Sequence, residues 1–584
     1  MNHLISINNL VENPTWKTKI LIWLADRVLG IARMNKLYQL HQMQGLSKED
    51  FADRLITLLE LDIKGLDELK ANIPREGPVV IASNHPFGGI EGVILARAIG
   101  SVRPDLKVLA NKGLGIFKEL KDYFIFTNPL SQNDPKNGPS LRKCIHHVKA
   151  GKALLIFPAG KVSYFQKAKK RISEHTWNKI VGRLISLEKC RLVPVFVNGE
   201  NSSMFYRTER VYFRMRMLLL GRELLNKTGH NIVINAGKSI DTKFIQGDSF
   251  EEKAALARAL SYAQAQSWRY TWPADTVTEY APLAQETASE LIAEELAALP
   301  ASQHLSSFKD YDVYYAYQSQ APNIVNEIAR LRELTFRLHN EGSGEPVDTD
   351  GFDATYTQLF IVKRQSNRII GAYRMGRTDK LLQGQANTDL SQLYLHKMFE
   401  FGENFANRKA PCMEMGRSFL IPEYQGSYQG LLLLWRGIGA FVSKFPQYRT
   451  LYGTVSISKL YDARSVALIQ HALIDSPGAQ NVKPRNKLPF ELHPEVADFF
   501  AQYDASKHLS AFLKVIEADA KDMPVLAKQY QKMGAKFHAL GIDKSFNHTP
   551  GLLLSVDLSK APEKLLKLYL GEAYEQYLRY GEAD

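Results

Sequence analysis

Short apolar runs alternate with stretches of helical spacing from about residue 61 to residue 240. The runs read PVVIASN, LKVLAN, YFIFTNP, ALLIFPAG, RLVPVFVNG and NIVINAG. Short runs of this kind, bounded by turn residues, are typical of buried strands, whereas the longer stretches between them are typical of helices. Their alternation favours a sheet covered by helices. We therefore predict an α/β domain over residues 61–250.

The flanking segments carry different patterns. Residues 1–60 have helical spacing, and residues 251–304 are rich in Ala, Glu and Leu, which predicts a helical connector. Residues 305–584 begin a second mixed domain. Its predicted order is the strand DVYYAYQ, the helix IVNEIARLRELTFRL, the hairpin TQLFIVKR and RIIGAYRMG, the strand CMEMGRSFLI, the helix LLLLWRGIGAFVSKF and the strand TLYGTVSIS. This order differs from that of the first domain, so we predict two α/β domains of different fold.

Apolar residues recur at helical spacing between basic residues near the N-terminus. The apolar positions are Ile20, Leu24, Val28, Ile31 and Met34. Such a helix either packs on its own domain or lies in a membrane interface. No run approaches the eighteen or so apolar residues of a membrane-spanning helix, and the N-terminus lacks a signal-peptide pattern.

The net charge of +13 indicates an acidic partner. An anionic membrane surface or an acidic carrier protein is favoured, and nucleic acid is not expected because no zinc-finger or RNA-binding pattern is present. The basic run KAKKR at 167–171 either binds such a partner or is a solvated face. The three cysteines are far apart and form no metal-ligand or disulfide pattern, which favours a cytoplasmic protein without a metal site.

The stretch VIASNHPFGGIEG at 80–92 places polar residues that could be catalytic at the end of a predicted strand. His85 follows the apolar run, Gly88 and Gly89 form a turn, and Glu91 lies in the first turn of the next helix. In open α/β sheets the site lies at the carboxyl ends of strands. A histidine there can act as a general base that a carboxylate orients, although an ordinary polar role is the simpler alternative.

Four blocks together resemble the lysophospholipid and glycerolipid acyltransferase family. SNHPFGGIEG resembles its first motif, FPAGKVS (157–163) its third and VPVFVNG (193–199) its fourth, and DYFIFTNP (122–129) stands in the place of the second. The resemblance implies that His85 and Glu91 form the catalytic pair. It also implies that substrate is bound by Asn84, Gly88, Gly89, Phe157, Pro158, Gly160, Lys161 and Ser163.

The differences from the motifs of that family indicate which class of acceptor is favoured. The family usually has Asp five residues after the histidine, whereas Glu91 is six residues after His85. Members that use a phosphate acceptor carry Arg in the second motif and Glu in the third, where this chain has Thr127–Asn128 and Ala159. A glycerol phosphate would need fork-like cationic contacts, so it is a less favoured acceptor.

A strand, a glycine-containing loop and a helix at 412–441 form a second candidate site, because a helix start can hold a phosphate. The segment resembles the GNAT acyltransferase core. Gln425 and Gly430 match the outer positions of its pyrophosphate loop, while Tyr428 replaces the middle glycine. The resemblance implies substrate binding by Gln425 and Gly430, and the departure favours an acyl carrier protein over coenzyme A as donor.

The closer resemblance of this half is to the ornithine N-acyltransferase family. Its recurring pieces are DTDGFD (348–353), MEMGRSFL (413–420), LWRGI (434–438) and LYGTVSIS (451–458). The resemblance implies that Glu414 and Arg417 are catalytic. In a regular strand they would point to opposite faces, but a bulge at Gly416 would bring them together. The alternative is a structural ion pair between them.

The two halves together resemble the bifunctional ornithine-lipid synthases. The resemblance implies that the second half N-acylates an amino acid, ornithine first, with a 3-hydroxyacyl chain, and that the first half esterifies the new hydroxyl. The expected donor is an acyl thioester on acyl carrier protein, with no permanently bound cofactor, at the inner face of the cytoplasmic membrane. The alternatives are a lysophospholipid acyltransferase with a non-catalytic GNAT-like module, and a membrane or carrier-protein binding module without activity.

Overall fold

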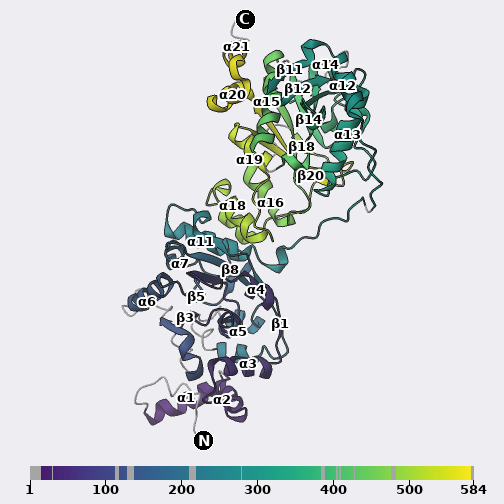
Figure 1. Cartoon of the computed structure of the whole chain (residues 1–584). Helices are drawn as coiled ribbons and strands as arrows, with labels where there is room; N and C mark the ends of the chain where they lie inside the picture. Colours follow the sequence, from purple (N-terminus) through teal and green to yellow (C-terminus); the bar gives the residue numbers. More distant parts are fainter. Residues whose placement is uncertain are drawn as a thin grey trace. The chain divides into compact units, whose positions relative to one another are not determined.

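The chain forms two compact units, which are described separately (Figure 1). The first comprises Met1–Arg269 with Leu492–Asp522, and the second comprises Tyr270–Glu491 with Met523–Asp584. The computed structural model describes residues 15–28, 30–111, 117–127, 137–208, 219–277, 279–382, 389–402, 405–406, 410–425, 428–474 and 482–580.

Helices open the first unit, as predicted. They are α1 (Trp16–Val28), α2 (Ile31–Leu40) and α3 (Lys48–Leu58). Ser47 caps α3, because its side-chain oxygen accepts from the Asp50 N–H, and Glu49 and Asp50 lie favourably at its positive end. No helix in the described ranges is both long and apolar enough to cross a bilayer.

The first unit is built on a mostly parallel sheet in the order β1-β9-β8-β2-β5-β3-β4. The antiparallel pairs are β8 with β9 and β8 with the short β10 (Ile240–Asp241). All six strands predicted between residues 61 and 240 are present, and β1 is additional. The strands are β1 (Asp62–Lys64), β2 (Val79–Ser83), β3 (Lys107–Asn111), β4 (Phe124–Thr127), β5 (Ala153–Ile156), β8 (Arg191–Asn198) and β9 (Asn231–Ala236).

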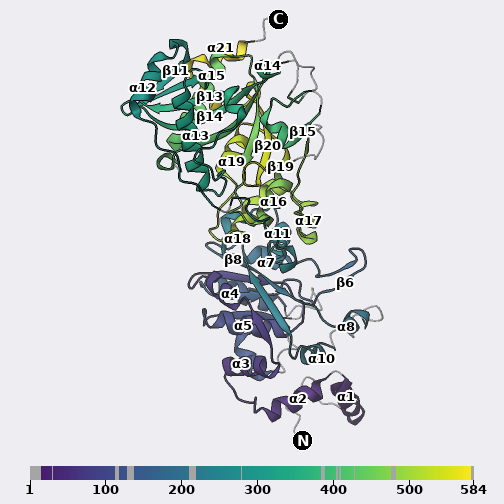
Figure 2. The ribbon, with the colours of Figure 1, turned by 90° about the vertical axis from the view of Figure 1, so that its right-hand side faces the viewer.

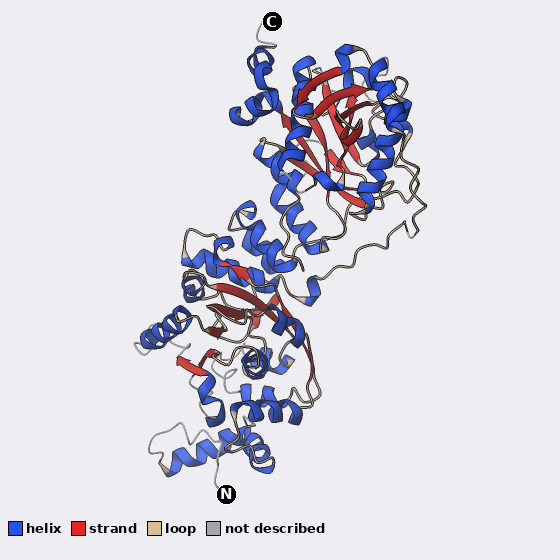
Figure 3. Cartoon of the chain, in the orientation of Figure 1, coloured by secondary structure: helices blue, strands red, loops and turns tan. Residues whose placement is uncertain are grey.

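Helices cover both faces of this sheet (Figures 2 and 3). Figure 2 shows α4 (Leu66–Asn72) and α5 (Ile90–Gly100) on one side, and α7 (Lys179–Leu184) and α11 (Phe250–Tyr262) on the other. Every residue of β2 is buried, which is why its sequence is a continuous apolar run rather than an alternating one. The other helices of this unit are α6 (Asn137–Lys149), α8 (Ser203–Thr208) and α10 (Leu220–Leu225).

A small antiparallel hairpin, β6 (Tyr164–Gln166) and β7 (Arg171–Ser173), follows the third motif. The sequence analysis treated its turn, KAKKR, only as a charge run. A hairpin this short has no hydrophobic period by which the sequence could predict it. It is also not stable by itself, so its position depends on contacts with the rest of the unit.

The structure divides the chain differently from the expected boundaries. Helices α17 (Pro494–Phe500) and α18 (Ala505–Ile516) belong to the first unit, where both contact α11. The expected connector is also shared, because α11 packs in the first unit while α12 (Ser289–Ala298) contacts α13 in the second. Helices α17 and α18 are distant from α11 in sequence, and no local sequence pattern shows that they pack against it.

The second unit holds an eight-stranded mixed sheet in the order β11-β12-β13-β14-β16-β17-β20-β19. Only β16 and β17 are parallel neighbours in this order. The predicted elements are present, and β11, β19 and β20 are additional. The strands are β11 (His304–Phe308), β12 (Tyr311–Ala316), β13 (Thr357–Lys363), β14 (Arg368–Arg377), β16 (Cys412–Leu420), β17 (Thr450–Ser456), β19 (Lys536–Asp543) and β20 (Thr549–Asp557).

Helices α13 (Pro322–Arg337), α15 (Tyr428–Lys444) and α16 (Ala463–Leu473) pack on this sheet. The remaining elements of the unit are short. They are α14 (Thr378–Leu381), α19 (Val525–Lys532), α20 (Glu563–Leu570), α21 (Tyr574–Arg579) and the strand pair β15 (Phe399–Phe401) and β18 (Val482–Pro484).

The two parallel strands of this sheet pair over only part of their length. Residues 412–415 of β16 pair with residues 450–453 of β17, although both strands continue further. On its other side β16 is irregular, because Arg374 lies opposite Gly416 but Ala372 lies opposite Phe419. The extra residue on β16 is a bulge, and it lies where the two parallel strands stop pairing.

Candidate active sites

His85 and Glu91 lie together at the carboxyl end of β2, the central strand of the first unit. His85 Nδ1 is 2.9 Å from Glu91 Oε1, with the Glu91 side chain fully buried and the His85 side chain 19% exposed. The Phe157 ring lies against the imidazole, with centroids 4.7 Å apart. An imidazole held on one nitrogen by a carboxylate can accept a proton on the other.

The turn between them explains the six-residue spacing. The N–H groups of Phe87 and Gly88 donate to Glu91 Oε1 at 2.9 and 2.8 Å, and Gly89 N–H donates to Oε2 at 2.9 Å. Gly88 has φ of 96°, and a Cβ there would lie 2.5 Å from the Leu220 side chain, so no other residue fits. The two glycines thus hold the carboxylate in a nest of backbone donors.

Glu91 is therefore a stable anion. Burial alone would raise the pKa of its carboxyl, but the His85 imidazole and the Gly88 and Gly89 N–H groups outweigh burial and lower that pKa to about 2. A carboxylate that stays charged orients the imidazole and stabilises its protonated form.

The backbone of His85 is held on both sides. Its C=O accepts from Ser163 N–H at 3.0 Å, and its N–H donates to the buried carboxylate of Glu174. Trp177 Nε1 donates to the other oxygen of Glu174 at 2.8 Å. The sequence analysis did not identify Glu174 or Trp177, because neither lies in a recognised block.

The other predicted residues of this site lie around it with structural contacts of their own. The Asn84 amide is buried, donates to Val197 C=O at 2.9 Å and accepts from Val197 N–H at 2.7 Å, so it joins β2 to β8. Pro158 C=O accepts from Asn178 N–H at 3.0 Å. Gly160 and the partly buried Lys161 lie in the turn before Ser163, with Gly160 at φ of 65°. Their expected contacts with substrate stay predictions.

Glu414 and Arg417 lie around one cavity of about 720 Å³ in the second unit. Glu414 is buried, and the O–H groups of Tyr356 and Tyr452 donate to its carboxylate at 2.9 and 3.3 Å. Burial raises the pKa of Glu414 to about 7, against the smaller lowering effect of these donors. A carboxylate that titrates near neutral pH is suited to general-base chemistry.

Arg417 occupies the bulge of β16 with φ of 50°, the left-handed region that few non-glycine residues adopt. The bulge was predicted at Gly416 and lies one residue later. Arg417 Nε is 3.2 Å from Asp348 Oδ2, and Nη2 donates to Tyr394 O–H oxygen at 3.0 Å. Within the described residues no ion pair joins Arg417 to Glu414, so the structural ion pair considered as an alternative is not present.

The acidic segment DTDGFD forms a network with three arginines. Arg332 contacts Asp353 through Nη1 and Nη2 at 3.0 and 2.9 Å, and Arg374 contacts Asp350 in the same two-pronged way. Arg417 joins through Asp348. Bidentate pairs fix the planes of both partners, so this network sets the position of Arg417 at the edge of the cavity.

Glu341 is a further buried carboxyl at the same cavity that the sequence analysis missed. It follows α13, and Ser456 Oγ donates to its Oε2 at 2.9 Å. Burial raises the pKa of Glu341 to about 7, which Ser456 and the charge of Arg417 partly oppose. It lies between α13 and DTDGFD, where nothing in the sequence distinguishes a buried carboxyl from a solvated one.

The predicted phosphate-binding loop is only partly described. Gln425 lines the cavity and its Nε2 donates to Leu420 C=O at 2.8 Å, and Gly430 is buried in the first turn of α15. Residues 426–427 and the side chain of Tyr428 lie outside the described part of the chain, as does Asn128 of the first domain's second motif.

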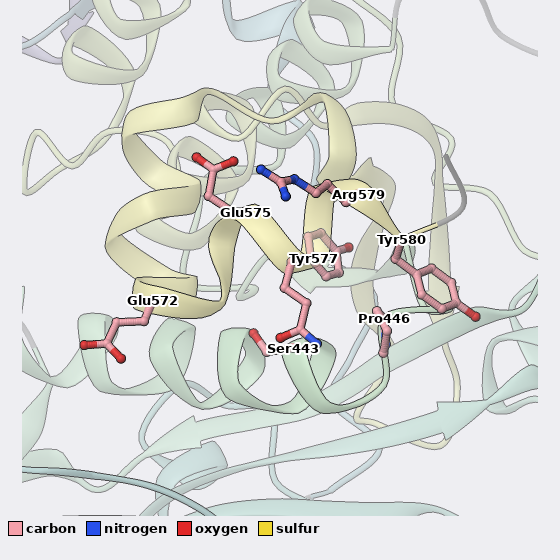
Figure 4. Close-up of a pocket in the computed structure, with 8 residues that line it drawn as sticks. Ser443, Pro446, Glu572, Glu575, Tyr577, Arg579 and Tyr580 are labelled. Carbon is pink, nitrogen blue, oxygen red and sulfur yellow. The ribbon is translucent and has the colours of Figure 1, made fainter. Parts of the chain in front are cut away.

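A separate cavity of about 520 Å³ lies beside the C-terminal helices (Figure 4). Ser443 and Pro446 line it from the end of α15, and the rest of the lining comes from residues 572–580. None of the residues predicted for either site lies there. The two sites predicted from sequence therefore remain the candidates for chemistry.

Comparison with known proteins assigns different families to the two parts of the chain that carry the candidate sites. A family described as Acyltransferase matches residues 59–268, and a family described as Acetyltransferase (GNAT) domain matches residues 331–436. The chain is similar to a glycine N(alpha)-acyltransferase of Phocaeicola vulgatus, with 26% identity over 266 residues that cover 42% of this chain and 80% of the relative.

The chain is also similar to a lyso-glycine lipid O-acyltransferase of the same organism, with 29% identity over 205 residues that cover 33% of this chain and 68% of the relative. Among solved structures, a CoA-dependent acyl-homoserine lactone synthase is 8% identical with a TM-score of 0.23 and covers 44% of this chain and 95% of that one, which is too weak to carry an argument. The chain thus has an acyltransferase domain and a GNAT domain.

Proposed function

The chain is an acyltransferase, and we propose that it makes an amino-acid lipid in two steps. The GNAT domain joins a 3-hydroxyacyl group to the amine of an amino acid, and the first domain then esterifies the hydroxyl of the product. The observation that carries this proposal is the presence of two separate acid–base sites in one chain, His85 with Glu91 and Glu414 beside Arg417. The names of the relatives, one for N-acylation and one for O-acylation, support the order.

In the N-acylation step Glu414 is the base. An amino acid carries an ammonium group at neutral pH, which must lose a proton before its nitrogen can attack the thioester carbonyl. Glu414, with a pKa of about 7, accepts that proton. The nitrogen then forms the amide bond as the carbonyl–sulfur bond breaks. The proton that the nitrogen loses in this step passes to the thiolate, so the donor leaves as a thiol. Arg417 lines the same cavity, and its guanidinium suits the acceptor's carboxylate.

In the O-acylation step His85 is the base. Its free ring nitrogen takes the proton of the lyso-lipid hydroxyl as the oxygen attacks a second acyl thioester, and Glu91 stabilises the imidazolium that forms. The proton then passes to the leaving thiolate. The Phe157 ring lies against the imidazole, and its apolar surface suits a lipid acceptor.

The amino acid is proposed to be ornithine, with glycine as the second candidate. Glu341 supports ornithine, because a carboxylate in the acceptor cavity suits a cationic side chain. The names of the relatives favour glycine. The head-group mass of the product separates the two.

We propose that acyl carrier protein is the acyl donor and that the protein acts at the surface of an anionic membrane. The net charge of +13 suits both. Helix α1 exposes large apolar side chains beside the exposed bases Lys17, Lys19 and Arg27, which is the composition of an interfacial helix. The exposed apolar residues are Trp16, Ile20, Leu21, Trp23 and Leu24.

Lipid mass spectrometry of a heterologous host tests the function. The wild-type chain should produce a diacylated amino-acid lipid, His85→Ala should accumulate the monoacylated lipid, and Glu414→Gln should produce neither. A host that gains no amino-acid lipid but changes its phosphatidic acid would support the lysophospholipid acyltransferase alternative instead. A host whose lipids do not change would support the binding-module alternative.

A further inference from the structure

The segment Leu492–Asp522 brings a buried carboxylate into the first unit from a distant part of the chain. Glu495, at the start of α17, is 2% exposed. Its Oε1 accepts from Arg171 Nε at 2.9 Å and Ser173 Oγ at 2.6 Å, and its Oε2 contacts Lys169 Nζ at 3.0 Å and Arg258 Nη1 at 2.9 Å. One carboxylate thus has four donors, three of them cationic, and charge-assisted hydrogen bonds of this kind are stronger than neutral ones.

Three of these four donors belong to the hairpin β6–β7. Lys169 is in its turn, and Arg171 and Ser173 form its second strand. The fourth, Arg258 of α11, also donates to Ser173 Oγ at 2.9 Å. Because so short a hairpin is not stable by itself, its position is set by what holds it, and Glu495 is the point where those contacts meet.

The residues that flank the hairpin are those that hold the backbone of His85. Ser163, just before β6, donates its N–H to His85 C=O, and Glu174, just after β7, accepts from His85 N–H. Both backbone polar groups of His85 are therefore bound by the same supersecondary element. A movement of the hairpin would move His85 relative to Glu91.

We propose that Leu492–Asp522 is part of the O-acyl-transfer site, and that Glu495 is a positioning residue that sets His85 through the hairpin. This inference rests on the proposed O-acylation by His85. The inference goes beyond the proposed function, because it makes the O-acylation site depend on Leu492–Asp522. This segment follows residues 270–491 of the second unit in the sequence but packs in the first unit. Small misplacements of a catalytic base cost on the order of 10²-fold in rate.

Asp498 offers a matched control on the same helix. It lies three residues after Glu495, is 40% exposed, and contacts Lys169 and Arg171 at 2.6 Å each. No contact joins it to Ser173 or Arg258 in the described part of the chain. Glu495→Gln and Asp498→Asn therefore remove the same charge and both weaken contacts to Lys169 and Arg171. Only Glu495 is buried and also binds Ser173 and Arg258, so Asp498→Asn should loosen the hairpin much less.

The test is steady-state O-acylation of supplied lyso-lipid by the purified full-length variants. We expect Glu495→Gln to lower kcat about 10- to 100-fold with KM for the lyso-lipid within about twofold, and Asp498→Asn to leave both within about twofold. N-acylation should be unchanged in both, which shows that the second unit is folded, and an unchanged KM for the lyso-lipid shows that the first unit is folded. Equal loss in the two variants, or wild-type kcat in Glu495→Gln, would overturn the proposal.

A second measurement reads the position of His85 without turnover. The ¹⁵N NMR signals of the His85 imidazole report its tautomer and its bond to Glu91, and they should shift in Glu495→Gln but not in Asp498→Asn. If Glu495→Gln does not fold, Glu174→Gln tests the same path, since it keeps the size of the side chain that binds His85 N–H. Unchanged His85 signals would overturn the inference, whereas a wild-type chain without O-acylation would overturn only the proposed function.

Discussion

Glu91 and Glu414 are buried carboxylates at the candidate sites, one in each unit, and the two behave in opposite ways. Glu91 has an imidazole and three backbone N–H groups around it, and its pKa falls to about 2 despite burial. Glu414 has two tyrosine O–H donors and one backbone N–H donor, that of Leu395 at 3.4 Å, and its pKa rises to about 7 because burial dominates. Burial is thus no guide to charge state. The neighbours decide whether a buried carboxyl orients a base or is itself the base.

The difference follows from where each carboxylate lies. Glu91 is in the first turn of α5, and the N–H groups of the turn that precedes this helix point at it. Glu414 lies in a strand whose N–H groups are already used in the sheet, so no comparable nest is available. A helix start therefore produces a permanent anion, and a splayed strand produces a carboxyl that titrates near neutral pH.

Removal of His85 should have the largest effect. His85→Ala should lower O-acylation about 10²- to 10⁴-fold, because the hydroxyl loses its base, while N-acylation in the other unit stays unchanged. Initial rates with supplied lyso-lipid and with amino acid measure the two steps. Full O-acylation by this variant would mean that the pair with Glu91 is structural.

Removal of Glu414 should have the second largest effect. Glu414→Gln should lower N-acylation about 10²-fold at neutral pH, and the wild-type rate should fall as pH drops through about 7, where Glu414 takes up a proton. Glu341→Gln is the matched control, since Glu341 also has a pKa of about 7 at the same cavity. Loss of the pH limb in Glu341→Gln but not in Glu414→Gln would assign the base to Glu341.

The same two carboxylates should affect stability with opposite sign. The pKa of Glu91 is below its unfolded value, so its contribution is present above about pH 4.5 and is lost as pH falls toward 2. The pKa of Glu414 is above its unfolded value, so the folded state loses stability as pH rises from about 4.5 through 7.

At pH 8, Glu91→Gln should therefore destabilise and Glu414→Gln should stabilise the fold, each by on the order of 3 kcal/mol. At pH 5 the effect of Glu414→Gln should nearly vanish, because the carboxyl is then already protonated. Calorimetry at the two pH values measures both. Effects of the same sign at pH 8 would contradict the comparison.

Shortening Glu91 should have the smallest effect. Glu91→Asp keeps the charge but cannot reach His85 and the N–H groups of the turn together, so O-acylation should fall roughly tenfold. Glu68→Asp is the control, because Glu68 is an exposed acid in the first turn of α4. If both changes are silent, Glu91 is only a residue that the helix dipole favours.

The local parts of the first site could be predicted from sequence. His85, the glycine turn and Glu91 are within seven consecutive residues, so the strand, turn and helix that place them are all encoded in one stretch. Its supports could not be predicted. Glu174 and Trp177 lie outside the motifs recognised in the sequence. Glu174, to which Trp177 donates, binds the backbone N–H of His85, and no side-chain pattern records that contact.

The second site depended more on the fold. Glu414 and Arg417 were identified by resemblance to a family. The bulge between them was predicted at Gly416 and lies at Arg417. The arginines that hold DTDGFD come from α13, β14 and β16, and Glu341 follows α13. Nothing in the spacing of these residues shows that they share a cavity.

Hydrophobic period, turn residues and helix starts act over a few residues, so most of the strands and helices, the two different α/β folds and the positions of His85 and Glu91 could be predicted from sequence. The charge of Glu414, the network around Arg417 and the place of α17 and α18 in the first unit could not. These depend on burial and on partners that are distant along the chain. Such contacts form because folding removes apolar surface and charged groups from water together, and no local pattern specifies which distant partner will meet them.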